Sequence, residues 1–83
     1  MKTYALPIDK IYVPAKRKRD LDEAKTTSLA EDILENGLKV PIQARKDEAK
    51  GRLVLIEGMH RLEAYKALGE EFIPGILVNA KQH

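Results

Sequence analysis

The chain has 83 residues, of which 43% are hydrophobic, enough for one domain with one small core. It contains no cysteine, which excludes disulfides, thiolate nucleophiles and thiolate metal sites. It has no run of transmembrane length and no secretion-signal segment, so we expect a cytoplasmic domain without membrane contact. The net charge of +2 is unevenly distributed. Residues 1–19 hold six basic residues and one acidic residue, and residues 20–37 hold the reverse.

The first part of the chain alternates short apolar pieces with prolines. Tyr4–Leu6 predicts a strand that ends at Pro7, residues 8–11 predict a single turn, and Tyr12–Val13 predict a second extended piece. Residues 14–20 are predicted to be a loop.

That loop contains a dense basic run: Lys16, Arg17, Lys18 and Arg19. Such a run is either a solvated segment or a contact to the phosphates of DNA or of a nucleotide. The sequence leaves both interpretations open.

A first helix is predicted over residues 22–36. Asp20 or Asp22 can cap its N-terminus, and Asn36-Gly37 is typical of a helix end. The spacing of its apolar residues predicts a buried stripe made of Leu21, Ala24, Leu29, Ile33 and Leu34.

The second half of the chain begins with a predicted hairpin, with strands at residues 41–46 and 52–57 joined by a polar turn at residues 47–51. A second helix is predicted from Met59 to Leu68, ended by Gly69.

Residues 72–78 predict a last strand, in which Pro74 favours a place at the strand start or at a sheet edge. Residues 79–83 are expected to fray.

The junction between the second hairpin strand and the second helix carries the clearest functional signal. The first N–H groups of a helix have no partner within it, and the helix dipole favours an anion there, above all a phosphate. His60 can donate a hydrogen bond and Arg61 is permanently cationic. We therefore predict that Gly58, Met59, His60 and Arg61 hold phosphate groups of a ligand.

A second set of candidates lies on the first helix. Lys25, Ser28 and Asp32 are spaced i, i+3 and i+7, so they share one face of that helix. A cation, a hydroxyl and a carboxylate beside an apolar edge predict a site for a ribose or a base, unless this face is simply solvated.

Glu57 is the carboxylate next to the predicted phosphate site. It is a candidate general base or ligand of a metal-bound water, unless it merely ends its strand in solvent. We expect no metal site built from protein ligands alone, because His60 has no second His or Cys at ligand spacing and His83 lies in the tail. Mg²⁺ carried in by nucleotide phosphates remains open.

The order of these elements resembles the ParB/sulfiredoxin superfamily. The residues that carry the resemblance are Leu21–Leu29, Pro41-Ile42, Gly58-x-His60-Arg61 and Ile73-Pro74. It spans about residues 4–78. It implies one domain over residues 1–83 with an α+β fold, a small mixed β-sheet with two packed helices.

The segments Leu21–Leu29 and Gly58–Arg61 are most similar to sulfiredoxins, which use ATP to reduce the sulfinic acid of peroxiredoxins. The resemblance implies that Lys25 and Ser28 contact the nucleoside and that Gly58, His60 and Arg61 hold phosphates. Asp32 stands where sulfiredoxins carry a hydroxyl residue.

The catalytic cysteine of sulfiredoxins is replaced here by Met59, whose thioether cannot become a thiolate. The resemblance therefore implies a shared nucleotide pocket without the shared reaction. Sulfiredoxins also carry an arginine shortly before the first helix. Arg17 and Arg19 lie in that region, and neither aligns without a gap.

ParB partition proteins are similar across Leu34–Ile42 and at the Gly58–Arg61 turn. They bind a cytidine nucleotide with this domain and DNA with a following helix-turn-helix domain, for which we expect no counterpart here. A third branch phosphorylates free serine with a carboxylate as base, and this sequence shows no serine-binding domain.

The sequence thus predicts a nucleotide-binding domain that takes ATP or ADP, with CTP as an alternative. Two other functions stay open. One is a ParB-like DNA-associated protein that acts through the basic run and a protein partner, and the other is a minimal NTPase or phosphotransferase with Glu57 as base.

Overall fold

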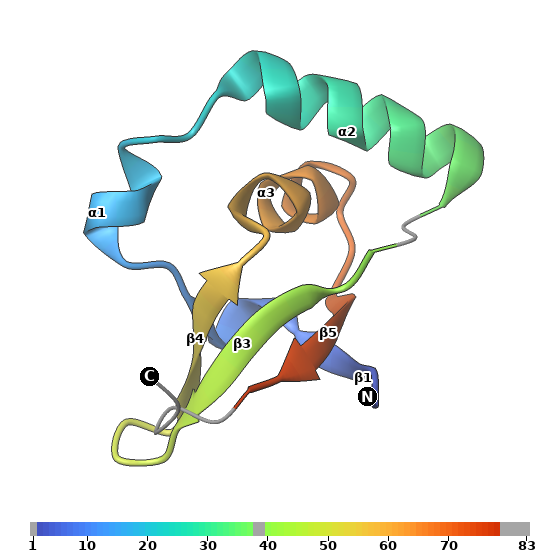
Figure 1. The fold of residues 1–83 in the computed structure, drawn as a ribbon. Coiled ribbons are helices and arrows are strands. Elements are labelled where there is room, and N and C mark those ends of the chain that lie inside the picture. Colours follow the sequence, from blue (N-terminus) through green and yellow to red (C-terminus); the bar gives the residue numbers. More distant parts are fainter. Residues whose placement is uncertain (1, 38–39, 79–83) are drawn as a thin grey trace.

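The computed structural model describes residues 2–37 and 40–78, which form one five-stranded mixed sheet with helices on one side of it (Figure 1). The elements in chain order are β1 (Tyr4–Pro7), the 3-10 turn η1 (Ile8–Lys10), β2 (Ile11–Tyr12), α1 (Ala15–Lys18), α2 (Glu23–Asn36), β3 (Ile42–Asp47), β4 (Arg52–Glu57), α3 (Met59–Ala67) and β5 (Phe72–Leu77). The predicted α+β class is confirmed, and Leu38 and residues 79–83 lie outside the described residues.

The strand order is β1-β5-β3-β4-β2, with parallel pairing for β3–β5 and β2–β4. This order places β5 inside the sheet, so the prediction from Pro74 of a strand start or a sheet edge is wrong. Pro74 lies opposite Ala5 of β1, and β5 pairs with β3 only from Gly75 onward. The missing N–H of Pro74 therefore falls where the β3–β5 ladder has not yet begun.

The predicted hairpin is confirmed as the antiparallel pair β3–β4. Its connecting loop is one residue shorter than predicted, because Asp47 still belongs to β3 and pairs with Arg52. The Asp47 carboxylate accepts a hydrogen bond from Arg52 Nε at 3.2 Å, and the Arg52 guanidinium lies 4.0 Å from the ring centre of Tyr12. These contacts fix the end of the hairpin beside β2.

The core lies between the sheet and α3. The four largest side chains with less than 2% of their surface exposed are Ile42, Leu55, Leu62 and Ile73. Three of them come from strands and Leu62 comes from α3, so α3 forms the layer directly on the sheet.

Helix α2 lies on α3 (Figure 1), and the buried stripe predicted for it is wrong. No residue of α2 is buried, and the Leu34 side chain is 73% exposed. The reason is the layer order, because α3 separates α2 from the sheet, against which the core is packed. The bounds of α2 agree with the prediction.

Asp22 rather than Asp20 caps α2. Its carboxylate accepts from the backbone N–H groups of Ala24 and Lys25 at 3.0 and 3.3 Å. The helix ends at Gly37, whose φ of 77° suits glycine.

The predicted loop at residues 14–20 is wrong in part, because Ala15–Lys18 form the single helical turn α1. Pro14 stands immediately before this turn, and the N–H groups of Arg17 and Lys18 both donate to its carbonyl oxygen. Proline is favoured at the start of helical segments because its φ is already close to the helical value.

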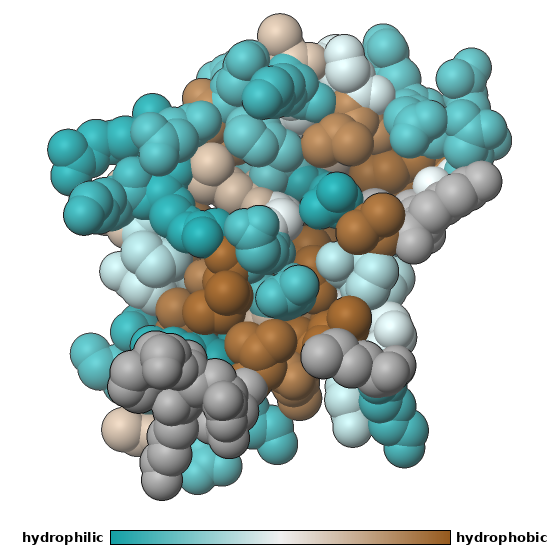
Figure 2. All heavy atoms as spheres, in the orientation of Figure 1, coloured by the Kyte–Doolittle hydropathy of each residue, from teal (hydrophilic) through white to brown (hydrophobic). Residues whose placement is uncertain are grey.

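Polar side chains cover α1 and most of α2, and hydrophobic side chains gather lower, over the sheet (Figure 2). Across residues 2–37 and 40–78, none of the helices has the length and apolar character needed to cross a bilayer.

Candidate functional site

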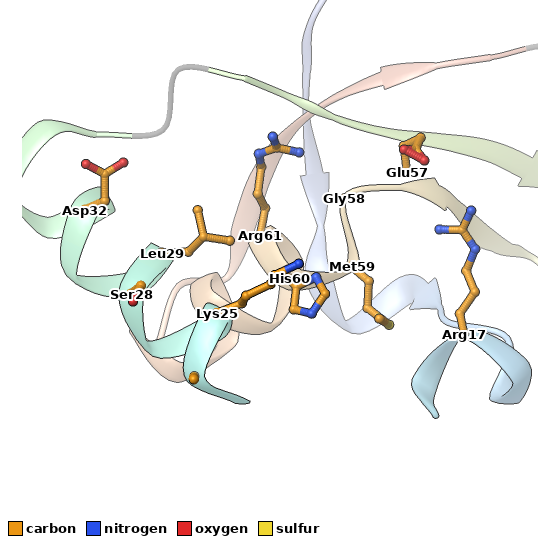
Figure 3. A pocket seen from close by; sticks show the side chains of 11 residues that line it. Arg17, Lys25, Ser28, Leu29, Asp32, Glu57, Gly58, Met59, His60 and Arg61 are labelled. Carbon is orange, nitrogen blue, oxygen red and sulfur yellow. The ribbon is translucent and has the colours of Figure 1, made fainter. Parts of the chain in front are cut away.

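A pocket of about 790 Å³ lies between α2 and the junction of β4 with α3. Its lining residues come from three separate parts of the chain: Arg17, Ala24, Lys25, Ser28, Leu29, Asp32, Glu57, Gly58, Met59, His60 and Arg61. The structure thus brings the two sets of predicted site residues into one pocket (Figure 3).

The N-terminus of α3 forms one end of this pocket. Its N-cap is Gly58, with a φ of 105° and a ψ of 32°, and no side chain caps the helix. The next three residues contribute the first N–H groups of α3, which have no acceptor within the helix. These groups and the helix dipole make the junction a site for an anion.

Gly58 is required at this junction for two reasons. Its φ lies in the left-handed region that side chains other than glycine rarely adopt. A β-carbon placed there would lie 2.6 Å from Cγ2 and 3.0 Å from Cβ of Ile42, which is fully buried. The close approach of Gly58 to β3 therefore sets the direction in which α3 leaves the sheet.

Helix α2 provides the opposite wall. Lys25, Ser28 and Asp32 lie along the side of α2 that lines the pocket, as their spacing predicts, and Leu29 adds an apolar surface beside them (Figure 3). Asp32 Oδ1 accepts a hydrogen bond from Asn36 Nδ2 at 2.9 Å, which holds the carboxylate in place.

The basic run divides between the pocket and the solvent. Arg17 is half-buried and lines the pocket, and its side chain extends from α1 toward the end of β4 that carries Glu57 (Figure 3). Lys16, Lys18 and Arg19 are exposed and line no part of this pocket. The predicted contact to phosphates included all four residues of the basic run. The helical turn α1 brings only Arg17 of these into the lining of the pocket.

The side chain of His60 makes a contact that the sequence did not predict. Its Nε2 lies 3.0 Å from the backbone nitrogen of Asp22 and accepts the hydrogen bond that this N–H donates. His60 is the second residue of α3, and Asp22 is the N-cap of α2. This bond therefore joins the two helix N-termini that flank the pocket.

Met59 belongs to both the pocket and the core. Its side chain is 8% exposed and packs in the same cluster as Ile42, Leu55 and Leu62. Met59 is thus an apolar side chain that anchors the first turn of α3.

The remaining charged groups limit what else the site can hold. Glu57 is exposed at the edge of the pocket, next to Gly58. Over the described ranges 2–37 and 40–78, no three His, Cys, Asp or Glu residues come together as a metal site.

Outside the pocket, burial raises the pKa of Tyr65 above its ordinary value, and the Glu70 carboxylate adds to the effect.

Comparison with known proteins gives consistent relatives. The chain is 39% identical over 64 residues to the chloroplastic/mitochondrial sulfiredoxin of Arabidopsis thaliana. The aligned region covers 77% of this chain and half the length of that protein. The crystal structure of Arabidopsis thaliana sulfiredoxin superposes with a TM-score of 0.83 at 31% identity, over 96% of this chain and 88% of the other.

Two more distant structures share the fold. The C-terminally truncated chromosome-partitioning protein ParB from Caulobacter crescentus, complexed with CTP-gamma-S, has a TM-score of 0.82 at 21% identity, over 99% of this chain and 47% of the other. A free serine kinase in complex with ADP has a TM-score of 0.86 at 17% identity, over 99% of this chain and 33% of the other.

The family model of the ParB N-terminal domain matches residues 2–83, nearly the whole chain. The strand-to-helix junction at Gly58 and the opposing helix α2 are the parts of this fold that build the pocket. The chain therefore belongs to the ParB N-terminal domain family, within the superfamily that ParB shares with sulfiredoxin.

Proposed function

We propose that this domain binds an adenine nucleotide, ATP or ADP, with its phosphates at the N-terminus of α3 and its nucleoside along α2. The observation that carries the proposal is one pocket that joins an uncapped helix N-terminus to the polar face of α2. Its volume of about 790 Å³ lies within the ordinary range for small-molecule sites. The ParB relative in complex with CTP-gamma-S makes CTP the alternative ligand.

Positive charge at the N-terminus of α3 favours phosphate binding at that end of the pocket. Arg61 stands in the first turn of α3, where the helix dipole disfavours a cation unless an anion is bound. Arg17 approaches the same end from α1. Two guanidinium groups and the first N–H groups of α3 provide the donors that a diphosphate or triphosphate needs.

The side chains along α2 favour a nucleoside at the other end of the pocket. Ala24 and Leu29 offer an apolar surface to a base or a ribose, and Lys25, Ser28 and Asp32 offer hydrogen bonds along the same wall. The Asp32 carboxylate would repel phosphates, so it favours the orientation in which the nucleoside lies beside α2.

A second candidate function is phosphoryl transfer or nucleotide hydrolysis. Glu57 lines the pocket beside the proposed phosphate site, so it is the candidate general base. Mg²⁺ would then arrive with the phosphates. Release of phosphate from ATP by the wild-type domain, lost in Glu57→Gln with nucleotide binding retained, would support this function.

The test of the proposed function is a calorimetric titration with ATP, ADP, CTP and GTP, each with and without Mg²⁺. NMR shifts of the labelled domain during the same titrations locate the ligand. We expect the largest shifts at residues 58–62 and 25–32. Shifts that cluster elsewhere would contradict the assignment of the pocket.

Sulfinic-acid reduction is not expected, because Met59 supplies no thiolate. Purified wild-type protein should leave sulfinylated peroxiredoxin unrepaired in the presence of ATP, as measured by mass spectrometry of the peroxiredoxin cysteine. The variant Met59→Cys places a thiol at a position that lines the pocket. Slow repair by that variant would show that the rest of the site is competent, whereas repair by the wild type would contradict the prediction.

DNA binding by this chain alone is expected to be weak and non-specific. Three members of the basic run are exposed, and α2, which follows them, presents several carboxylates. So few cations release few counterions, and binding should fade as salt approaches about 150 mM. A mobility-shift assay with random duplex and a selected site library measures this. Submicromolar binding to one sequence with little salt dependence would favour a ParB-like DNA-associated role instead.

A further inference from the structure

We propose that His60 is a positioning residue that sets the spacing between α2 and α3, and so the width of the pocket. The inference deepens the proposed function, because it concerns the walls of the same pocket. Its first test needs no ligand.

The N-terminus of α2 has no capping box. In a capping box, the third residue of the helix is Glu or Gln, and its side chain accepts from the backbone N–H of the N-cap. The corresponding residue of α2 is Lys25, which has donors and no acceptor. The Asp22 N–H therefore lacks its usual local partner, and His60 of α3 supplies the acceptor from a distant part of the sequence.

This bond also assigns the tautomer of His60. A backbone N–H only donates, so Nε2 accepts and carries no proton. In the neutral ring the proton is then on Nδ1. The nitrogen that bonds α2 is thus not available to a phosphate.

The position of α2 is set by its packing on α3, in which its side chains are at most partly buried. None of its residues is buried, and α3 lies between it and the sheet. Lys25, Ser28 and Asp32 are carried by α2, whereas Gly58 and Arg61 are carried by the β4–α3 junction. A bond between Asp22 and His60 joins these two parts at the end of the pocket where both helices begin, so it holds the two walls at one separation.

The first experiment determines the tautomer in the wild-type domain without ligand. Long-range ¹H–¹⁵N correlation spectra of the histidine rings, recorded at about pH 8 so that an ordinary imidazole is neutral, report which nitrogen is protonated. The chain has one other histidine, His83, and the variant His60→Gln tells the two signals apart. We expect Nδ1 of His60 to be protonated and Nε2 bare. A protonated Nε2 would overturn the proposal.

The second experiment uses two amide substitutions as matched probes. Glutamine places its amide near the position of Nε2 and can still accept from Asp22, whereas asparagine places its amide near Nδ1 and cannot reach. Positioning predicts that His60→Gln binds ADP within about twofold of the wild type. It also predicts that His60→Asn and His60→Ala lose about fivefold or more, the scale of one net hydrogen bond.

The outcomes separate positioning from direct ligand contact. If Nδ1 contacts phosphate and the Asp22 bond is irrelevant, His60→Asn retains affinity and His60→Gln loses it, which overturns the proposal. Backbone NMR shifts at residues 22–25 in the absence of nucleotide should follow the same order, with small changes for Gln and large ones for Asn and Ala. If no nucleotide binds even to the wild type, the proposed function fails, whereas the tautomer and these ligand-free shifts still decide the role of His60.

Discussion

Replacing Gly58 by alanine is expected to destabilise the domain by about 2–6 kcal/mol and to remove nucleotide binding. A side chain at a φ of 105° costs about 1–3 kcal/mol in backbone strain. The new methyl group would also meet Ile42 at 2.6 Å, and overpacking a buried site costs about 1–3 kcal/mol more. Denaturant unfolding followed by circular dichroism measures the change in the free energy of unfolding.

Gly69→Ala is the matched control for that variant. Gly69 also has a positive φ, 78°, and a β-carbon there meets nothing within 4 Å. It therefore isolates backbone strain from the clash, and we expect it to cost about 1 kcal/mol. Equal destabilisation by the two substitutions would show that β3 gives way at Ile42 and that the close approach of Gly58 does not determine the junction.

Replacing Arg61 by alanine is expected to weaken ATP and ADP binding about tenfold or more with little change in stability. A charge-assisted hydrogen bond to phosphate contributes about 1.5–3 kcal/mol, and the half-buried Arg61 makes no ion pair with a described residue that its loss would break. Isothermal titration calorimetry measures the affinity, and the unfolding curve checks the fold.

Two further substitutions make that result specific. Arg19→Ala removes the same charge from an exposed position outside the pocket, so affinity should stay within about twofold of the wild type after screening by salt. Arg17→Ala removes a guanidinium that lines the pocket, and it should weaken the triphosphate more than the monophosphate. If Arg61→Ala and Arg19→Ala have the same effect, binding depends on net charge and the assigned phosphate site is wrong.

Local chemistry in the sequence determined most of the elements. The start of α2 at Asp20 or Asp22, its end at Gly37 and the apolar pieces on either side of the polar hairpin turn depend on neighbouring residues, so they were predictable without a structure. The choice of Asp22 as the cap came from the structure. The same holds for the Gly58 junction, where a strand, a glycine and a helix follow one another directly. Lys25, Ser28, Asp32 and residues 57–61 were predicted as site residues by spacing, by helix-end chemistry or by resemblance. Arg17 was predicted only as one of the four residues of the basic run, and Ala24 and Leu29 were assigned to the buried stripe.

Tertiary structure alone decided which surfaces these elements share. Helix α2 has an apolar pattern but lies on α3, so Leu34 stays exposed. Pro74 is tolerated inside the sheet because the pairing of β5 with β3 begins only at Gly75. Arg17 enters the pocket because α1 winds one turn, and His60 meets Asp22 across 38 positions of the chain. These features depend on contacts between distant segments, and the pattern of one segment carries no information about which partner will cover it.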